Sequence, residues 1–97
     1  MTELSAADAA VRQARAAEAQ TYAPVELRFA EDKLSRARSA ADAEEYTLAI
    51  ELAAQAQVDG ELAEAKSLAA RARAEVRQKT EENARMSREL LGEGERP

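Results

Sequence analysis

Carboxylates are the only abundant side chains in this sequence that could perform acid–base chemistry. The 97 residues include 19 Asp and Glu but no His and no Cys. Imidazole catalysis, cysteine nucleophiles, disulfides and thiolate metal sites are therefore excluded. Two acidic runs stand out, Glu31–Lys33 (EDK) and Ala43–Tyr46 (AEEY). Because no glycine-rich loop or nucleophile motif accompanies them, we interpret both runs as solvated helical faces and predict no catalytic residues and no enzyme activity.

Metal binding by carboxylates alone requires several side chains that converge on one point. Glu61 and Glu64 are three residues apart, so they would share one face of a helix. The sequence supplies no further ligand near them. We therefore predict neither a metal site nor a cofactor site.

A basic run follows, and it is a candidate binding surface. Between Lys66 and Lys79 there are five basic residues and only Glu75 opposes them. Such a run can contact phosphates, lipid headgroups or an acidic partner. It has no interleaved aromatic residues, and the whole chain has a formal charge of −5, which argues against nucleic-acid binding. We interpret the run as surface charge, with phosphate or headgroup contact as the alternative.

Two tyrosines, Tyr22 and Tyr46, stand near the expected starts of two helices. We expect their rings to cover the ends of an alanine-lined core, where alanine alone would leave space. The alternative is a cage for a ligand, which we favour less than this structural role.

The elements that position these residues are helices. About a quarter of the chain is alanine, 34% is charged and only 3% is aromatic, a composition typical of long helices and coiled coils. No apolar run approaches the ~20 residues that a membrane-spanning helix needs, so no span is predicted.

Apolar spacing predicts three helices, at about residues 3–19, 24–42 and 45–91. We expect a break at residues 20–23, with Pro24 in the first position of the second helix. Glu26 falls in the positive first turn of that helix, and Asp32 and Arg36 are spaced for an ion pair. The stripe of the second helix is formed by Leu27, Ala30, Leu34, Ala37 and Ala41.

The third helix has a seam of small residues that a neighbouring helix could approach closely. The seam consists of Tyr46, Ala49, Ala53, Ala56, Gly60, Ala63, Ser67, Ala70 and Ala74, and we expect Leu48, Ile50, Leu52 and Leu62 to widen it. We interpret Gly60 as a close-contact point within an unbroken helix, with a hinge as the alternative. The acidic and then basic blocks of this helix would favour an antiparallel arrangement in any dimer.

An unbroken third helix would be about 70 Å long at ~1.5 Å per residue, more than twice the length of either other helix. The predicted fold is therefore all-α: a three-helix antiparallel bundle or hairpin with two short helices packed on the N-terminal half of one long third helix. Its C-terminal half must project, pair with another chain or fray. We expect residues 1–91 to form a single domain and residues 92–97 (GEGERP) to form a flexible tail or the start of a linker.

Part of the chain resembles the bacterial domain-of-unknown-function family 4398. The resemblance depends on the YAP start at Tyr22–Pro24, on Glu26 and Leu27 after it, and on the ELAEAK run at residues 61–66. It extends over roughly residues 5–90. The sequence differs by Gly60, where alanine is usual, and by Val25 between Pro24 and Glu26.

The resemblance implies a cellular context and no chemistry. Such domains typically follow a lipoprotein signal peptide, and some precede a peptidoglycan-binding domain. We therefore expect a non-catalytic module of the bacterial cell envelope on the periplasmic side, lipid-anchored in the full-length protein. It would act as a spacer or bind a protein partner, a second copy included, through the long third helix. The alternative is a soluble cytoplasmic adaptor or coiled-coil dimerisation module.

Overall fold

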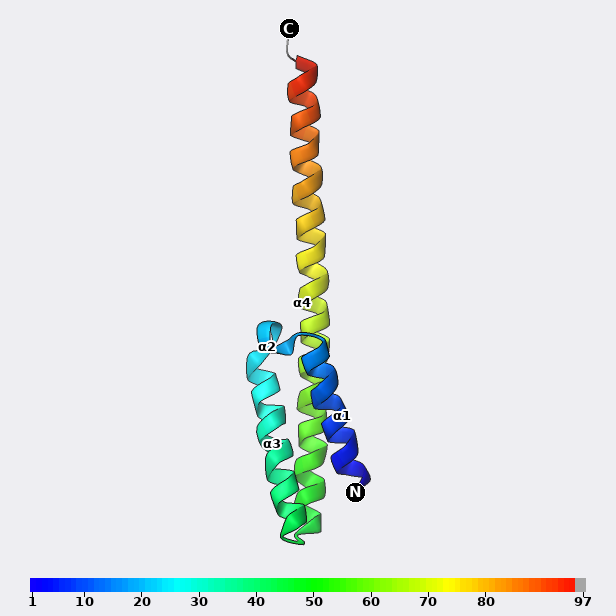
Figure 1. Ribbon diagram of the computed structural model, residues 1–97, viewed down its shortest axis with the longest axis vertical. Coiled ribbons are helices and arrows are strands. Elements are labelled where there is room, and N and C mark those ends of the chain that lie inside the picture. The colour runs from blue at the N-terminus through cyan, green and yellow to red at the C-terminus, as the bar shows by residue number, and fades with distance from the viewer. Residues whose placement is uncertain (96–97) are drawn as a thin grey trace.

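The chain is a short three-helix bundle from which one long helix projects. The computed structural model describes residues 1–95, with side-chain burial through residue 92. Its helices are α1 (Thr2–Ala16), α2 (Ala19–Tyr22), α3 (Pro24–Asp42) and α4 (Tyr46–Glu95). In Figure 1, α1 and α4 run in the same direction and α3 runs against both. The molecule extends 81 × 18 × 13 Å, so the predicted all-α architecture is confirmed.

Both short helices pack against the N-terminal half of α4, as predicted. We call the bundle formed by α1, α2, α3 and residues 46–71 of α4 the head, and residues 72–95 of α4 the stalk. In the stalk every residue through 92 is exposed except Ala74, which is half-buried. The stalk therefore has no packing partner within the described part of the chain.

The first helix ends earlier than the sequence predicts. It stops at Ala16 rather than Ala19, because Glu18 adopts a left-handed conformation with φ 67° and ψ 39°. The backbone N–H of Glu18 donates to the carbonyl oxygen of Arg15 at 2.9 Å. The predicted break at residues 20–23 is largely wrong, since residues 19–22 form the single turn α2 and only Ala23 is extended (φ −146°). A left-handed glutamate costs about 1–2 kcal/mol and has no sequence signal.

The second predicted helix, α3, has the predicted bounds, and Pro24 occupies its first turn. Its C-terminus is a Schellman motif built on Glu44, which has φ 62°. The N–H of Glu44 donates to Ala41 and the N–H of Glu45 donates to Ala40, at 3.0 and 2.8 Å. Glycine normally occupies the left-handed position, which is why this turn lacked a sequence signal.

The long helix begins at Tyr46 and continues to Glu95. Residues 92–95, which the sequence assigned to a flexible tail or the start of a linker, continue the helix, while residues 96 and 97 lie outside the described residues. Glycine at 92 and 94 weakens a helix by about 1 kcal/mol each without removing a hydrogen-bond donor. A helix already formed over 46 residues can continue through them, because propagation is easier than nucleation.

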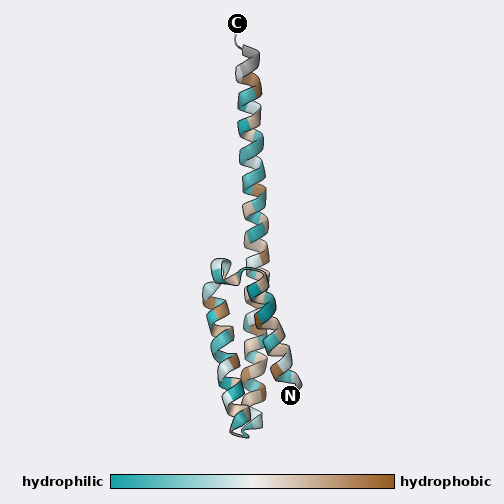
Figure 2. Ribbon diagram, in the orientation of Figure 1, coloured by the Kyte–Doolittle hydropathy of each residue, from teal (hydrophilic) through white to brown (hydrophobic). Residues whose placement is uncertain are grey.

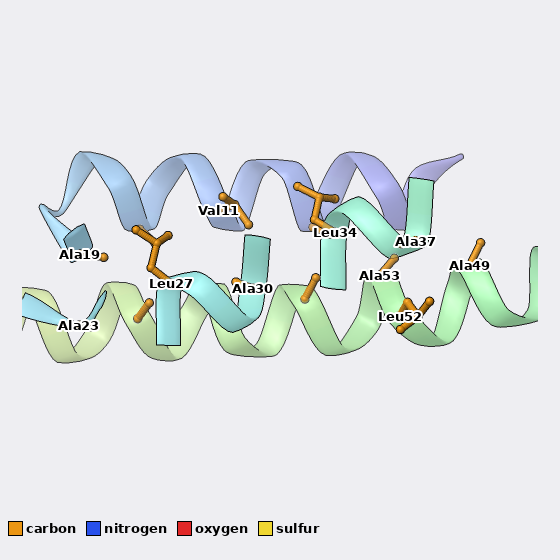
Figure 3. Packing of buried hydrophobic residues seen from close by; sticks show 14 of the residues in the cluster. Val11, Ala19, Ala23, Leu27, Ala30, Leu34, Ala37, Ala49, Leu52 and Ala53 are labelled. Carbon is orange, nitrogen blue, oxygen red and sulfur yellow. The ribbon is translucent and has the colours of Figure 1, made fainter. Parts of the chain in front are cut away.

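The core of the head is lined by alanine. Four larger side chains, those of Val11, Leu27, Leu34 and Leu52, are buried among 13 buried alanines. In Figure 3, Val11 and Leu34 point into the space between the helices. The predicted stripes on α3 and α4 are largely confirmed: Ala49, Ala53, Ala56 and Ala63 are fully buried, whereas Ala40 takes the place expected for Ala41, which is half-buried.

The prediction that larger residues widen the buried seam of α4 is mostly wrong. Leu52 is buried, but Leu48, Ile50 and Leu62 are each more than 40% exposed. The reason is geometric, because small seam residues let α1 and α3 approach so closely that a narrow stripe of α4 suffices. The larger residues beside the stripe are left in solvent.

Gly60 is the closest point of this packing. A Cβ placed on Gly60 would lie 3.0 Å from both the carbonyl carbon and the Cβ of Ala10, and 3.2 Å from its carbonyl oxygen. The helix continues through Gly60 without a break. The interpretation of Gly60 as a contact point is therefore confirmed.

We predict that Gly60→Ala destabilises the head. Alanine gains about 1 kcal/mol of helix propensity, but overpacking a tight contact costs about 1–3 kcal/mol. The neighbouring atoms are backbone atoms and the Cβ of Ala10, and none of them can move away by a side-chain rotation. The expected result is a net loss of about 1 kcal/mol in the free energy of unfolding, measured by urea denaturation.

Gly92→Ala is the matched control, since the same residue change is made on the same helix where no atom lies within 4 Å of the added Cβ. It should leave stability unchanged or raise it slightly. Equal stabilisation by both substitutions would contradict the close approach of α1.

Candidate functional site

The acidic run at Glu31–Lys33 is used in three separate ion pairs. Glu31 accepts a hydrogen bond from Arg15 Nε at 3.2 Å. Asp32 pairs with Arg36 at 3.7 Å, as the spacing predicted, and Lys33 Nζ donates to Asp59 Oδ2 at 2.7 Å. The three side chains thus point to α1, along α3 and to α4, and they form no common site.

The AEEY run at residues 43–46 and the two tyrosines also form no joint site. Every residue of the run is exposed. Tyr22 ends α2 and Tyr46 begins α4, so the whole length of α3 separates them and no cage contains both. Tyr46 is 55% exposed and Tyr22 is 37% exposed, so neither residue is buried in the core.

The two carboxylates considered for metal binding have no further ligands. Glu61 Oε1 accepts a hydrogen bond from Gln57 Nε2 at 3.1 Å along the exposed surface. Among the side chains that the structure describes, those of residues 1–92, no three acidic groups are placed so that they could hold a metal ion. None of the helices in residues 1–95 is both long enough and apolar enough to cross a membrane.

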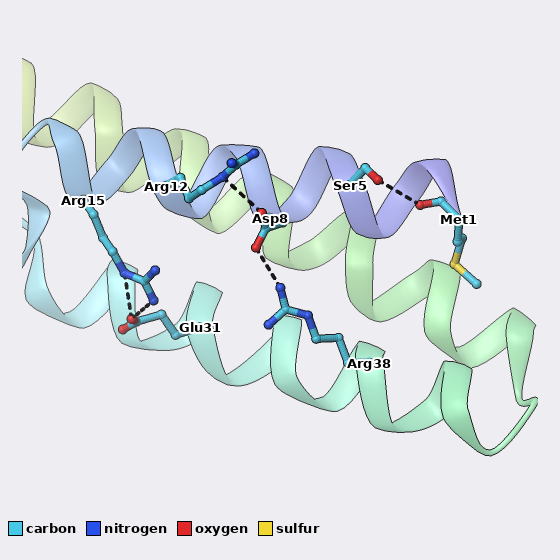
Figure 4. A network of polar contacts seen from close by, with 7 residues as sticks. All are labelled: Met1, Ser5, Asp8, Arg12, Arg15, Glu31 and Arg38. Atoms are coloured by element: carbon cyan, nitrogen blue, oxygen red, sulfur yellow. Dashed lines mark hydrogen bonds and ion pairs between the residues drawn. The ribbon is translucent and has the colours of Figure 1, made fainter.

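Ion pairs fasten α1 to α3 along the outer surface of the head. Asp8 accepts from Arg38 Nη2 at 2.7 Å and also pairs with Arg12 at 3.1 Å. Figure 4 shows this cluster beside the Arg15–Glu31 pair. The Asp8–Arg38 and Arg15–Glu31 pairs join α1 to α3, whereas the Asp8–Arg12 pair lies within α1. These side chains are largely exposed, so each pair contributes about 0–1 kcal/mol and serves mainly to fix the register.

The basic run begins at the junction of head and stalk. Lys66 Nζ donates to Glu26 Oε2 at 2.9 Å, and Arg71 lies 3.9 Å from Glu18. Between them, Ser67 is fully buried, and its hydroxyl has no hydrogen-bond partner within the described residues. The first two basic residues of the run therefore connect α4 to the top of the head.

The Lys66 contact shifts the titration of Glu26. The hydrogen bond from Lys66 is the largest cause that lowers the pKa of the Glu26 carboxyl, and the backbone N–H of Glu26 adds to it. Glu26 also lies in the positive first turn of α3, as the sequence predicted. Folding therefore favours the charged form of this carboxylate.

The other basic residues of the run lie on the stalk. Arg73, Arg77 and Lys79 are exposed beyond the head. Figure 2 shows a stalk that is mostly hydrophilic, with separate hydrophobic turns along it. The arrangement offers charge and exposed apolar side chains, and it brings no reactive groups together.

Two of the shallow grooves on the surface of the head involve α3. One, of about 360 Å³, is lined by Pro24, Val25, Arg28 and Phe29 on the outer face of α3. The other, of about 280 Å³, lies between α3 and α4 and is lined by Lys33, Ala54, Gln55, Val58 and Asp59. Both are open surface features, in contrast to the enclosed and largely apolar pockets that hold small ligands.

Comparison with known families agrees with the sequence resemblance. The chain matches the model of the Domain of unknown function (DUF4398) over residues 2–79. The chain belongs to this family. The match is shorter than the expected residues 5–90 at its C-terminal end, so the DUF4398 region comprises the head and the basic run and stops within the stalk. No curated protein and no solved structure matches the chain.

We predict that Lys66→Met raises the pKa of Glu26 towards its ordinary range, because the substitution removes the hydrogen bond from Lys66, which is the largest cause of the lowered pKa. The sign follows from linkage: a carboxyl whose folded pKa is lowered contributes stability that is present above its unfolded pKa, about 4.3. That contribution is lost as the pH falls through the lowered folded value. The variant should therefore lose less stability than the wild type on acidification below about pH 5.

The measurement is NMR titration of the Glu26 carboxyl, with urea denaturation at neutral and acid pH. Arg77→Met is the control, because it also removes one positive charge from α4, at an exposed stalk position that does not contact Glu26. An unchanged Glu26 titration in Lys66→Met would show that the pair does not persist in solution.

Proposed function

We propose that this DUF4398 domain is a non-catalytic interaction module whose head is a rigid base and whose α4 presents the binding surface. The observation that carries the proposal is the unequal length of the helices. The head covers α4 only as far as about Arg71, and the following 24 residues project as a single helix. Most helical stability in proteins comes from tertiary packing, which the stalk lacks within the described chain, so a partner packed on it would stabilise it.

Three features of the described chain support an interaction role. Among the acidic candidates, Glu31 pairs with Arg15 of α1 and Asp32 pairs with Arg36 of α3, so these two neighbouring carboxylates point to different partners. The stalk exposes Val76, Met86 and Leu90, each by about 60% or more. Its basic residues Arg73 and Arg77 add charge that an acidic partner would complement.

We further propose that the module lies in the bacterial cell envelope, on the periplasmic side, and is lipid-anchored in the full-length protein. The support is membership of the family together with the context that the resemblance implies. Association with peptidoglycan would then depend on another domain. The alternative is a cytoplasmic adaptor with the same α4 surface.

The location has a direct test. Mass spectrometry of the N-terminal peptide of the native full-length protein, purified from its own cells, should find a lipid-modified cysteine upstream of Leu4. A plain Met1 or an unmodified amine at Thr2 would contradict the envelope proposal and favour the cytoplasmic adaptor.

The interaction role has a separate test. A photo-crosslinking amino acid in place of Val76 should form adducts with protein in living cells, because that position is exposed on the stalk. The same replacement at Ser35, which is exposed on α3, is the control and should form few. Absence of adducts at Val76, and at Leu90 in a second variant, would contradict a protein-binding stalk.

A further inference from the structure

The long helix has a second seam on the face turned away from the head. On the front face, the small residues from Ala49 to Ser67 contact α1 and α3. On the opposite face, residues recur at seven-residue spacing in two interleaved series. The first series, which we assign to heptad position a, is Gln55, Leu62, Ala69, Val76, Asn83 and Leu90; the second, at position d, is Val58, Ala65, Ala72, Lys79 and Met86.

All eleven of these residues are exposed. We name them the back seam. Val58, near the start of the seam, is 63% exposed and Leu90, at its end, is 64% exposed, so the head covers neither end. The seam begins behind the head and continues along the stalk without a change of phase. Intervals of three and four residues alternate throughout the seam, and a partner helix in a coiled coil packs against this pattern.

We propose that the back seam forms a parallel, in-register, two-stranded coiled coil with a second copy of this chain. The proposal rests on the proposed function, in which α4 is the binding surface, and it names the partner. The argument for a second copy comes from the polar residues of the seam and from the charges that flank it.

Asn83 is the first of these observations. A single asparagine at an a position is tolerated in a parallel pair because it faces the same asparagine of the other copy, and the two amides bond to each other. Any offset would leave the amide against an apolar residue. Asn83 therefore selects the in-register pairing of two identical chains.

The flanking charges select the parallel direction. Position g holds Glu61, Glu75, Glu82 and Glu89, with Leu68 between them. In an antiparallel pair g positions face g positions, so the glutamates of the two copies would meet and repel. This local pattern opposes the antiparallel preference that the acidic and basic blocks of the whole helix suggest.

In a parallel pair, each g position faces the e position five residues further along the other copy. Glu61 then faces Lys66, which carries the opposite charge and is 55% exposed despite its contact with Glu26. Glu75 and Glu82 face Thr80 and Ser87, which are uncharged. No like charges meet at these flanks, and adjacent residues decide the direction more strongly than distant blocks, because charge interactions between exposed groups are screened beyond about 8–10 Å.

The size of the seam is enough for a weak, reversible dimer. Residues 55–90 span about 54 Å at ~1.5 Å per residue, and with a contact width of ~10 Å they cover about 500 Å² on each chain. The total of about 1,000 Å² is at the lower limit for a specific interface. Lys79 at a d position places two ammonium groups near the axis and weakens the pair further, so we expect a micromolar dissociation constant.

The head does not obstruct this arrangement. The groove between α3 and α4 is lined by Gln55 and Val58 on one side and Lys33 on the other, so the back seam opens to solvent beside α3. The two heads would lie on the outer sides of the helix pair, at the same end. Phe29, which is 55% exposed on α3, would lie on the rim of the interface.

The test is sedimentation equilibrium of the full 97-residue chain and of variants with matched charge changes. The wild type should show a concentration-dependent dimer. Val76→Glu, at an a position, should weaken it by more than about tenfold, whereas Gln78→Glu, two residues away at position c, should change it by less than about threefold. Lys79→Leu should strengthen it by about tenfold or more.

Cysteine variants test the direction, because the protein has no cysteine of its own. Leu62→Cys and Leu90→Cys should each form a disulfide between identical copies on mild oxidation, since a parallel register brings each position against itself. An antiparallel pair would instead place a positions against d positions, so Leu62→Cys would form a disulfide with Met86→Cys only when the two variants are mixed; that result would overturn the parallel arrangement.

A chain that stays monomeric at ~1 mM would overturn the self-association. If the Val76 photo-crosslink still captured another protein in that case, the binding role of α4 would stand and only the second copy would be wrong. If Val76→Glu and Gln78→Glu weakened the dimer equally, self-association would be real but the back seam would not be its surface.

Discussion

The close approach of α1 to α4 at Gly60 and Ala10 is the constraint on which the remaining structure depends. Alanine buries little area, so each buried alanine contributes far less than the about 1.5–3 kcal/mol of a buried leucine. A core of this kind is stabilised by the density of contacts between helices rather than by large side chains. Close helix spacing is therefore a condition for stability in the head.

Close spacing also determines which residues are exposed. Because the front seam of α4 is narrow, Leu48 and Leu62 fall outside it and remain in solvent. The same narrowness leaves more than half of the circumference of α4 uncovered along the whole head. Small front residues thus leave α4 free to carry a second, independent surface on its back, and this is what allows one helix to serve both folding and binding.

Much of the fold could be predicted because it depends on local periodicity. Pro24 marked the start of α3, and three-and-four spacing identified Leu34 and Ala53 as core residues. The two left-handed glutamates, Glu18 and Glu44, could not be predicted, since their conformation is imposed by the packing of the helices on either side rather than by their own preference. The exposure of Leu62 depends on the distance between helices, which sequence spacing does not encode.

The sequence predicted the separate features of the α4 surface but not the contacts between them. The sequence located the basic run and the length of α4, but it did not reveal that Lys66 contacts Glu26, 40 residues away. Such pairs require the register between α3 and α4, and that register is known only when the helices are placed. Likewise, Val76, Asn83 and Leu90 were recognisable as one face of a helix, but only the placement of the head shows that this face continues behind it to Val58.

The basic run lies at the point where the front surface of α4 leaves the head and the back seam continues along the stalk. Lys66 and Arg71 pair with Glu26 and Glu18, which lie outside α4. Arg73 and Arg77 lie where the head ends and α4 continues as a single helix. A helix that leaves a bundle loses packing on its front face at that point, and its remaining stability must come from its own backbone hydrogen bonds or from a partner. The back seam passes through this transition without interruption. A partner packed along the seam would therefore contact both the head part and the stalk part of α4 and stabilise them together. A seam with polar positions at Lys79 and Asn83 suits that role, because an interface of modest strength can open and close without unfolding the head.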